Sequence, residues 1–245
     1  MRVWAIADLH LSFGVPEKSM EVFGWKDYAE KIEKSWREVV QEDDLVLIAG
    51  DISWAMKLDE AKKDLEWITQ LPGTKVMIKG NHDHWWSSLS KVQQALPSSM
   101  YVIQNNAFYR QGIAIGGARL WDSDEYNFDA CIDFKPKERS EKEKLDSEKI
   151  FKRELERLEM SLKALPDGAK VRIAMTHYPP VGLKLFSSKA SALLEKYGVS
   201  ICVFGHLHNV KTMDPLFGTA RGVTYYLTSC DYLNFQPLHI YSSAK

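Results

Sequence analysis

The hydrophobic pattern of the chain repeats one arrangement five times: a short apolar run ends abruptly in acidic, amide or imidazole residues. Apolar runs without polar alternation are typical of strands buried on both faces of a sheet. The runs are 2–10 (RVWAIADLH), 44–51 (DLVLIAGD), 75–83 (KVMIKGNHD), 171–180 (VRIAMTHYPP) and 200–208 (SICVFGHLH). We therefore predict five strands that place polar residues just past their carboxyl ends.

Amphipathic stretches lie between these runs, and the spacing of their apolar residues predicts helices over Asp27 to Val40, Leu58 to Thr69 and Ser87 to Ala95. Helices that connect parallel strands form an open α/β sheet, which binds ligands at the carboxyl ends of its strands. The later segments 101–117 and 225–243 contain short apolar runs separated by turn residues. We expect these segments to form strands of a second sheet.

The segment from Lys135 to Ala164 alternates charges of both signs and keeps an incomplete helical stripe of apolar residues. This pattern favours a solvated surface helix. A charged interaction arm is the alternative. No repeat, linker or low-complexity tract divides the chain, so we predict one domain over residues 1–245.

The formal net charge is -1, so no global positive field attracts a polyanion, and nucleic acid is disfavoured as an obligatory partner. The three cysteines form no CxxC pair, which suits a reducing compartment. The first residues do not resemble a signal peptide, and no apolar run reaches membrane-spanning length. We expect a soluble cytoplasmic protein without a membrane partner, and the sequence does not indicate its oligomeric state.

The first two polar clusters contain carboxylates and a histidine. Asp8 and His10 stand two positions apart, so on an extended backbone both side chains project to the same side and could hold one metal ion. A turn-capping role for Asp8 and a surface position for His10 are the alternatives. Asp51 follows Gly50, whose flexibility frees the carboxylate to reach inward or to bridge two cations.

The later clusters add an amide and more imidazoles. The GNHD turn supplies Asn81, His82 and Asp83 in successive positions, and His177 ends the fourth run. His206 and His208 again stand two apart, an arrangement suited to two metal ions. With His84, which directly follows the GNHD turn, six of the seven histidines belong to these clusters, which makes chance placement a poor explanation.

The ordered motifs DLH, GD, GNHD, TH and GHLH closely resemble those of the calcineurin-like metallophosphoesterases. The resemblance spans 8–208. It implies an α/β fold of two packed mixed β-sheets flanked by helices, the four-layer sandwich of that family. It also implies that Asp8, His10 and His208 bind one metal ion, that Asn81, His177 and His206 bind the other, and that Asp51 bridges them.

The family roles further imply that His82 contacts the substrate and protonates the leaving group, while Asp83 orients the His82 ring. Two divalent ions would activate a water molecule and stabilise an in-line displacement at phosphorus. The mixed N and O ligands suit Mn, Fe or Zn, and we favour Mn. The expected function is thus a metal-dependent phosphohydrolase acting on a small phosphomonoester or phosphodiester, possibly nucleotide-like.

The chain departs from the protein-phosphatase members of the family just after the GD and GNHD motifs. Those members usually carry arginines there, whereas this chain reads GDISWAM and GNHDHWW, which puts protein phosphatase activity in doubt. His84 and Trp54 follow these motifs and are candidate substrate-binding residues, with stacking as one role for aromatic rings near the metals. Packing in the core is the alternative for the tryptophans, including Trp85 and Trp86.

Two further features could border the site. Arg119 could reach a phosphate from a later strand, since guanidinium pairs well with phosphate oxygens, although a surface ion pair explains it equally well. The insertion 13–25 follows the DLH motif. Its aromatic residues either border the site or anchor the loop to the core.

Two other functions compete with a small-molecule phosphoesterase. A nuclease of the same family would need a basic track, and the lysines and arginines here are scattered among acids. A noncatalytic metal-binding scaffold should have lost a ligand or the acid, and every such position is intact.

Overall fold

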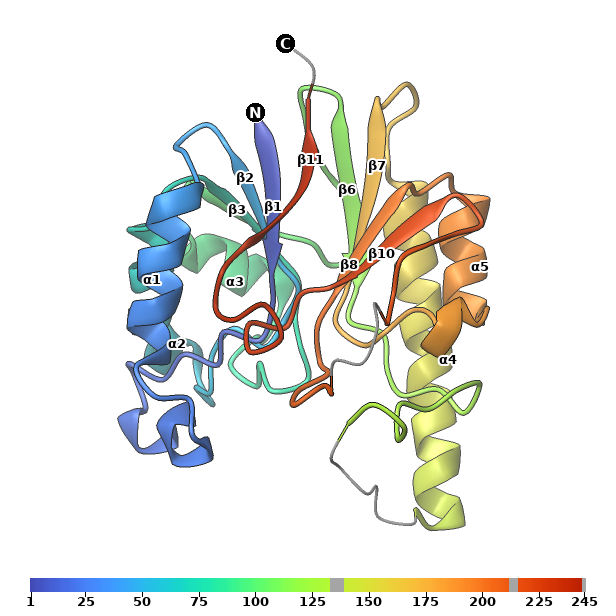
Figure 1. The fold of residues 1–245 in the computed structure, drawn as a ribbon, viewed down its shortest axis with the longest axis horizontal. Helices are drawn as coiled ribbons and strands as arrows, with labels where there is room; N and C mark the ends of the chain where they lie inside the picture. The colour runs from blue at the N-terminus through green and yellow to red at the C-terminus, as the bar shows by residue number, and fades with distance from the viewer. Residues whose placement is uncertain (133–138, 212–215, 244–245) are drawn as a thin grey trace. The chain divides into compact units, whose positions relative to one another are not determined.

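The computed structural model describes residues 1–132, 139–211 and 216–243. The residues group into two compact units, each built around one β-sheet. Unit 1 contains residues 1–102 and 228–245, and unit 2 contains residues 103–227. The ribbon in Figure 1 shows that the last strand, β11, runs beside the first strand, β1, so both ends of the chain contribute to one sheet.

Unit 1 contains a five-stranded sheet in the order β11-β1-β2-β3-β4. Its strands are β1 (Arg2–Ile6), β2 (Leu45–Ile48), β3 (Thr74–Met77), β4 (Met100–Val102) and β11 (Leu238–Ser242). Its helices are α1 (Tyr28–Val39), α2 (Leu58–Thr69) and α3 (Leu89–Ala95), with two short 3-10 helices at Pro16–Lys18 and Met20–Phe23. Strands β1 to β4 are parallel, and β11 pairs antiparallel with β1.

The core of unit 1 forms where the helices bury their apolar stripes against alternate strand residues. Ile32 and Trp36 of α1 are fully buried in the same cluster as Ile6 and Ile48. The indole N–H of Trp36 also donates to the carbonyl of Pro72, so its one polar atom is satisfied inside the core. This packing holds the ends of β1 and β2 in place, which is where the first polar clusters follow.

Unit 2 contains a six-stranded sheet in the order β5-β6-β7-β8-β10-β9. Its strands are β5 (Phe108–Arg110), β6 (Ile113–Ala118), β7 (Val171–Thr176), β8 (Ile201–Phe204), β9 (Thr219–Ala220) and β10 (Val223–Leu227). Its helices are α4 (Glu141–Lys163) and α5 (Lys189–Lys196), with a 3-10 turn at Leu183–Leu185. Strands β6, β7, β8 and β10 are parallel, and the edge strands β5 and β9 are antiparallel to their neighbours.

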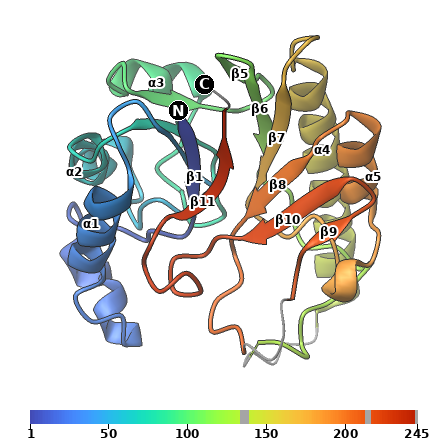
Figure 2. The same ribbon diagram turned by 45° about the horizontal axis from the view of Figure 1, so that its top comes forward.

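The solvent exposure of helix α4 differs along its length. Its first six residues are exposed, with Leu145 at 55% exposure, and it begins with a capping box between Ser140 and Glu143. The helix contacts β6 and α5, and its second half buries Leu158 and Leu162. Figure 2 shows α4 and α5 next to each other beside the sheet of unit 2. The predicted surface helix is therefore correct for the first half only, because the apolar stripe of the second half covers the sheet. Residues 135–138 of the predicted segment lie outside the described residues.

The fold class predicted from the sequence is confirmed: the protein is α/β, with two mixed sheets flanked by helices. All five predicted strands and the three helices of unit 1 are present. The single-domain assignment stays a prediction. None of the helices in the described part of the chain has the length and apolar character needed to cross a membrane.

The close pairing of β6 and β7 at Gly117 leads to a prediction about the stability of the fold. A Cβ atom there would lie 2.1 Å from the carbonyl oxygen of Met175, so Gly117→Ala must push the two strands apart. We expect a loss of about 2–4 kcal/mol in the free energy of unfolding, measured by urea denaturation.

Gly218→Ala is the matched control, because a Cβ atom there meets no atom within 4 Å. It should leave the urea midpoint nearly unchanged. Equal midpoints for the two variants would show that the contact at Gly117 is easily relieved.

Candidate metal centre

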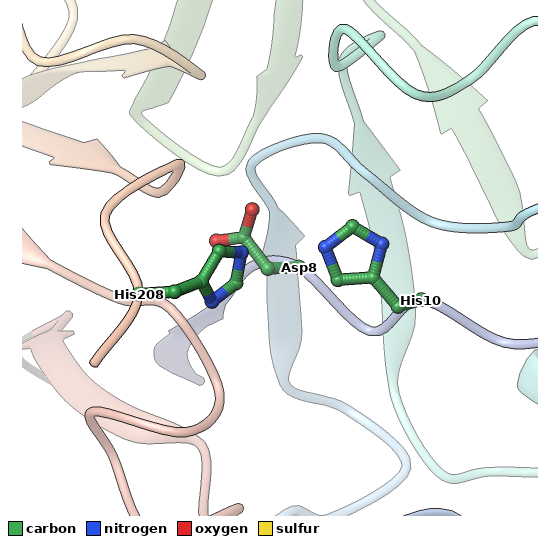
Figure 3. A group of neighbouring side chains, drawn as sticks. All are labelled: Asp8, His10 and His208. Atoms are coloured by element: carbon green, nitrogen blue, oxygen red, sulfur yellow. The ribbon is translucent and has the colours of Figure 1, made fainter. Parts of the chain in front are cut away.

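The loops that follow β1 and β2 are bound to each other by backbone hydrogen bonds. The amide of Asp8 donates to the carbonyl of Gly50 over 2.9 Å, and the amide of His10 donates to the carbonyl of Asp51 over 3.0 Å. The side chains of Asp8 and His10, which follow β1, are drawn in Figure 3. Unit 1 thus holds these residues on two loops that are hydrogen-bonded to each other.

The backbone of these loops is left-handed rather than extended. The φ angles are 59° at Asp8, 46° at His10 and 52° at Asp51. The extended backbone assumed for Asp8 and His10 is therefore wrong, although the ligand atoms of the two side chains still lie close enough to hold one ion. Non-glycine residues adopt this conformation at a cost and do so often at functional sites.

The side chains of Asp8, His10 and Asp51 are buried, and their potential ligand atoms lie close together. The ligand atoms of Asp8 lie within 4.8 Å of those of His10 and of Asp51. The His10 Nε2 atom lies 3.8 Å from the Asp51 Oδ2 atom. Two buried carboxylates and one imidazole form a donor set that suits a divalent transition-metal ion, because its negative charge offsets the charge of a cation.

The GNHD turn after β3 packs tightly on Asp51. The amide of His82 donates to the Asp51 Oδ1 atom over 2.8 Å. A Cβ atom on Gly80 would lie 2.0 Å from that same oxygen and 2.2 Å from the Asp51 amide nitrogen. Glycine is therefore required at position 80 for the turn to approach this carboxylate. Asn81 lies in the same turn, between these two residues.

Asp83 is completely buried and joins the loops after β2 and β3. Its carboxylate accepts hydrogen bonds from the amides of Ile52, Ser53 and Gly80, and from the indole N–H of Trp85. Burial raises the pKa of Asp83 to about 6, the nearby charge of Asp51 adds to this increase, and the hydrogen-bond donors oppose it. These contacts give Asp83 a role in holding the loops together, and its predicted effect on the His82 ring stays a prediction.

Aromatic rings surround His10 and His82 in unit 1. The Trp54 ring stacks on the His10 ring, with centroids 4.8 Å apart and planes at 20°. It also lies 4.5 Å from the His82 ring. The His84 ring lies 6.4 Å from the His82 ring and is exposed. Trp54 and His84 therefore lie beside the residue expected to act as the acid, and their contact with substrate stays a prediction.

The other tryptophans of the GNHDHWW segment serve the core. Trp85 and Trp86 are buried members of the hydrophobic cluster of unit 1, so the packing alternative holds for both. In the insertion 13–25, Trp25 is buried and its ring lies 6.0 Å from the His10 ring. The amide of Phe13 donates to the buried carboxylate of Asp64 on α2, which anchors the start of the insertion.

Unit 2 carries three histidines after two of its strands. His177 follows β7 and is completely buried, while His206 and His208 follow β8. The ring centroids of His177 and His206 lie 5.1 Å apart. The amide of Gly205 donates to the carbonyl of His177, which ties the two loops together. His208 is drawn in Figure 3 in the loop after β8.

One ring beside this histidine pair has no counterpart in the sequence prediction. The ring of Tyr178 lies against the ring of His206, with centroids 3.9 Å apart and planes at 35°. Tyr178 directly follows His177 in the THYPP motif, so its position in the motif was the available signal.

Arg119 is part of a partly buried ion pair, in which the carboxylate is buried and the guanidinium is partly exposed. Its guanidinium lies 3.3 Å from the carboxylate of Glu154, which is only 1% exposed, and 4.6 Å from the ring centroid of Trp121. Arg153 and Arg157 also lie near this carboxylate, at 3.8 and 2.9 Å. This ion pair accounts for the position of Arg119, and its contact with a phosphate stays a prediction.

The class of this chain is thus an α/β protein that carries candidate metal-binding carboxylates and imidazoles on the loops after its parallel strands. The chain belongs to the calcineurin-like phosphoesterase family, whose sequence model matches residues 1–210. Among curated proteins, the Gene 66 protein of Mycobacterium phage L5 is 37% identical over 84 residues, which cover 33% of this chain and 39% of the phage protein. The chain thus matches about two fifths of the length of that relative.

Solved structures share the fold over nearly the whole chain. The protein TT1561 of Thermus thermophilus has a TM-score of 0.53 at 14% identity and covers 97% of both chains. The phosphopantetheinyl hydrolase PptH of Mycobacterium tuberculosis has a TM-score of 0.52 at 15% identity, covering 99% of this chain and 98% of its own. A protein of unknown function from Aquifex aeolicus has a TM-score of 0.50 at 14% identity, covering 97% and 95%. These identities establish the common fold.

Proposed function

We propose that this protein is a dinuclear-metal-dependent phosphoesterase that hydrolyses a small phosphomonoester or phosphodiester. The observation that carries the proposal is the buried set of Asp8, His10 and Asp51 on left-handed loops of unit 1. Burying two carboxylates this close together is unfavourable without a cation between them. Membership of the calcineurin-like phosphoesterase family supports the same reaction class.

The ligands are assigned to two ions by the chemistry of their side chains and by the family pattern. By the family pattern, we assign Asp8, His10 and His208 to one ion. We assign Asn81, His177 and His206 to the other, with Asp51 bridging both. The carboxylate, amide and imidazole donors without thiolate suit Mn, with Fe or Zn as alternatives.

When bound, the two dications would supply a nucleophile at neutral pH and offset charge on the phosphate. The protein itself would hold this centre with only two anionic ligands, Asp8 and Asp51, which leaves the centre positive and attractive to an anionic ester. His82 is the proposed general acid, because imidazole titrates near neutrality and can protonate a leaving alkoxide. Asp83 would support it by holding the GNHD turn on Asp51.

The experiment that tests this function uses chelator-stripped protein and two substrates, p-nitrophenyl phosphate and bis(p-nitrophenyl) phosphate. Added Mn should restore turnover of at least one substrate, and the preferred substrate identifies the ester class. His239→Ala is the matched control, because this histidine lies on β11 outside the clusters and should not change the rate.

The same experiment separates an enzyme from a scaffold. Two bound ions per chain without turnover of either ester would argue against the phosphoesterase and for a noncatalytic metal-binding role. Turnover that needs no metal would contradict the proposed mechanism.

A further inference from the structure

We propose that a cavity within unit 2 binds the flat ring of the alcohol part of the substrate, and that this ring is a heteroaromatic base of the nucleobase type. The cavity has a volume of about 280 Å³, and His206 is one of its lining residues. This inference rests on the proposed function, because it assumes that His206 holds a metal ion next to the phosphate. An ester bound there would extend its organic group into the cavity.

One wall of the cavity is a series of aromatic rings that begins at His206. The Tyr178 ring lies 3.9 Å from the His206 ring, and the Trp121 ring lies 5.2 Å from the Tyr178 ring. All three residues line the cavity. Such rings offer flat faces on which a planar group can stack, with little specificity for its identity.

Contacts with Arg119 hold the aromatic rings of this wall in place. The guanidinium of Arg119 lies over the Trp121 ring and is fixed in turn by the buried carboxylate of Glu154. The Arg119 backbone carbonyl also accepts hydrogen bonds from the amides of His177 and Tyr178. A site whose rings are already in place loses little conformational entropy when a ligand stacks on them.

A second part of the lining comes from the segment 122–132, which is tied to the loop that carries Tyr178. The Tyr126 hydroxyl donates to the carbonyl of Pro179, and the Tyr126 and Phe128 rings pack edge to face 5.5 Å apart. A Cβ atom on Gly182 would lie 2.9 Å from the Cβ atom of Tyr126, so the two segments are in close contact. The cavity is thus formed by two segments that hold each other in place.

The charges of the lining select against a second phosphate group. Arg139 is paired with Asp122, with 3.8 Å between nitrogen and oxygen, and Asp129 adds another carboxylate. The lining carboxylates therefore outnumber the lining arginine. Carboxylate, hydroxyl and amide groups of Asp122, Ser123 and Asn127 can accept hydrogen bonds from ring amino groups. An uncharged ring with amino groups fits this lining better than a bare hydrocarbon ring or a polyphosphate chain.

The test measures binding by calorimetry on the Mn-loaded protein. The ligands are phosphonate analogues of adenosine 5′-monophosphate and ribose 5-phosphate, in which CH2 replaces the ester oxygen, so hydrolysis contributes no heat. Stacking of one base is worth about 1–3 kcal/mol, so the adenosine analogue should bind about 5- to 150-fold more tightly. Trp121→Ala should bring this ratio close to one, whereas Trp121→Phe should keep most of it.

Tyr109→Ala is the matched control, because this tyrosine is 54% exposed on β5 and should leave the ratio unchanged. Equal affinities of the wild-type protein for the two analogues, or no binding of either, would overturn the proposal. An affinity ratio between the two analogues that is unchanged in Trp121→Ala would also overturn the proposal. The nitrophenyl assay reports catalysis separately, so failure of the cavity and failure of the phosphoesterase are distinguishable.

Discussion

Asp51→Asn is expected to lower turnover of the nitrophenyl esters by at least about 10³-fold and to reduce the Mn content of the purified protein. Asparagine has the same shape and can still accept the hydrogen bond from the His82 amide, so the fold should survive. The variant replaces one of the two proposed anionic ligands, the one that would bridge the metal ions. A loss of rate of this size corresponds to the loss of several kcal/mol of charge stabilisation in the transition state.

The measurements are steady-state rates at saturating Mn and metal content per chain after dialysis. Asp59→Asn is the matched control, because Asp59 is 88% exposed on α2 and pairs only with Lys62 among the described ion pairs. Full activity with full metal content in Asp51→Asn would remove Asp51 from the metal centre.

His82→Ala is expected to lower turnover by about 10²–10⁴-fold while both metal ions stay bound. Its amide hydrogen bond to Asp51 belongs to the backbone and is retained in alanine, so the GNHD turn should keep its position. The Trp54 ring loses its neighbour, but it keeps its stacking contact with His10.

Substrates with different leaving groups test the role of His82 as a general acid more directly. Nitrophenolate leaves readily without a proton, whereas an alkoxide does not, so His82→Ala should slow an alkyl ester more than a nitrophenyl ester. Equal losses on both esters would argue against general acid catalysis. A parallel loss of metal would instead make His82 a ligand.

The strands and helices could be predicted because each follows from a local pattern. Helix α2 runs over Leu58–Thr69, as its apolar spacing predicts, and α3 begins at Leu89 because the Ser88 hydroxyl caps its first turn. The pairing of β11 with β1 was not predictable, because it joins opposite ends of the chain and leaves no local signal.

The candidate site could be predicted in its residues but not in its geometry. The polar residues after the apolar runs marked Asp8, His10 and Asp51, and their ligand atoms lie close together in unit 1. Their role as metal ligands stays a prediction. Their left-handed backbone was not foreseen, because it is imposed by hydrogen bonds between loops far apart in sequence. The contact between the Tyr178 and His206 rings was also missed, because ring contacts depend on side-chain placement that the motif alone does not fix.

The left-handed backbone at Asp8, His10 and Asp51 also bears on how this protein can evolve. Each such residue costs on the order of 1–3 kcal/mol, and glycine or asparagine would relieve much of that cost. Selection for thermal tolerance alone would therefore enrich glycine and asparagine at the three positions and discard the donor set. A lineage that keeps aspartate and histidine there has been under continuing selection for what those side chains bind.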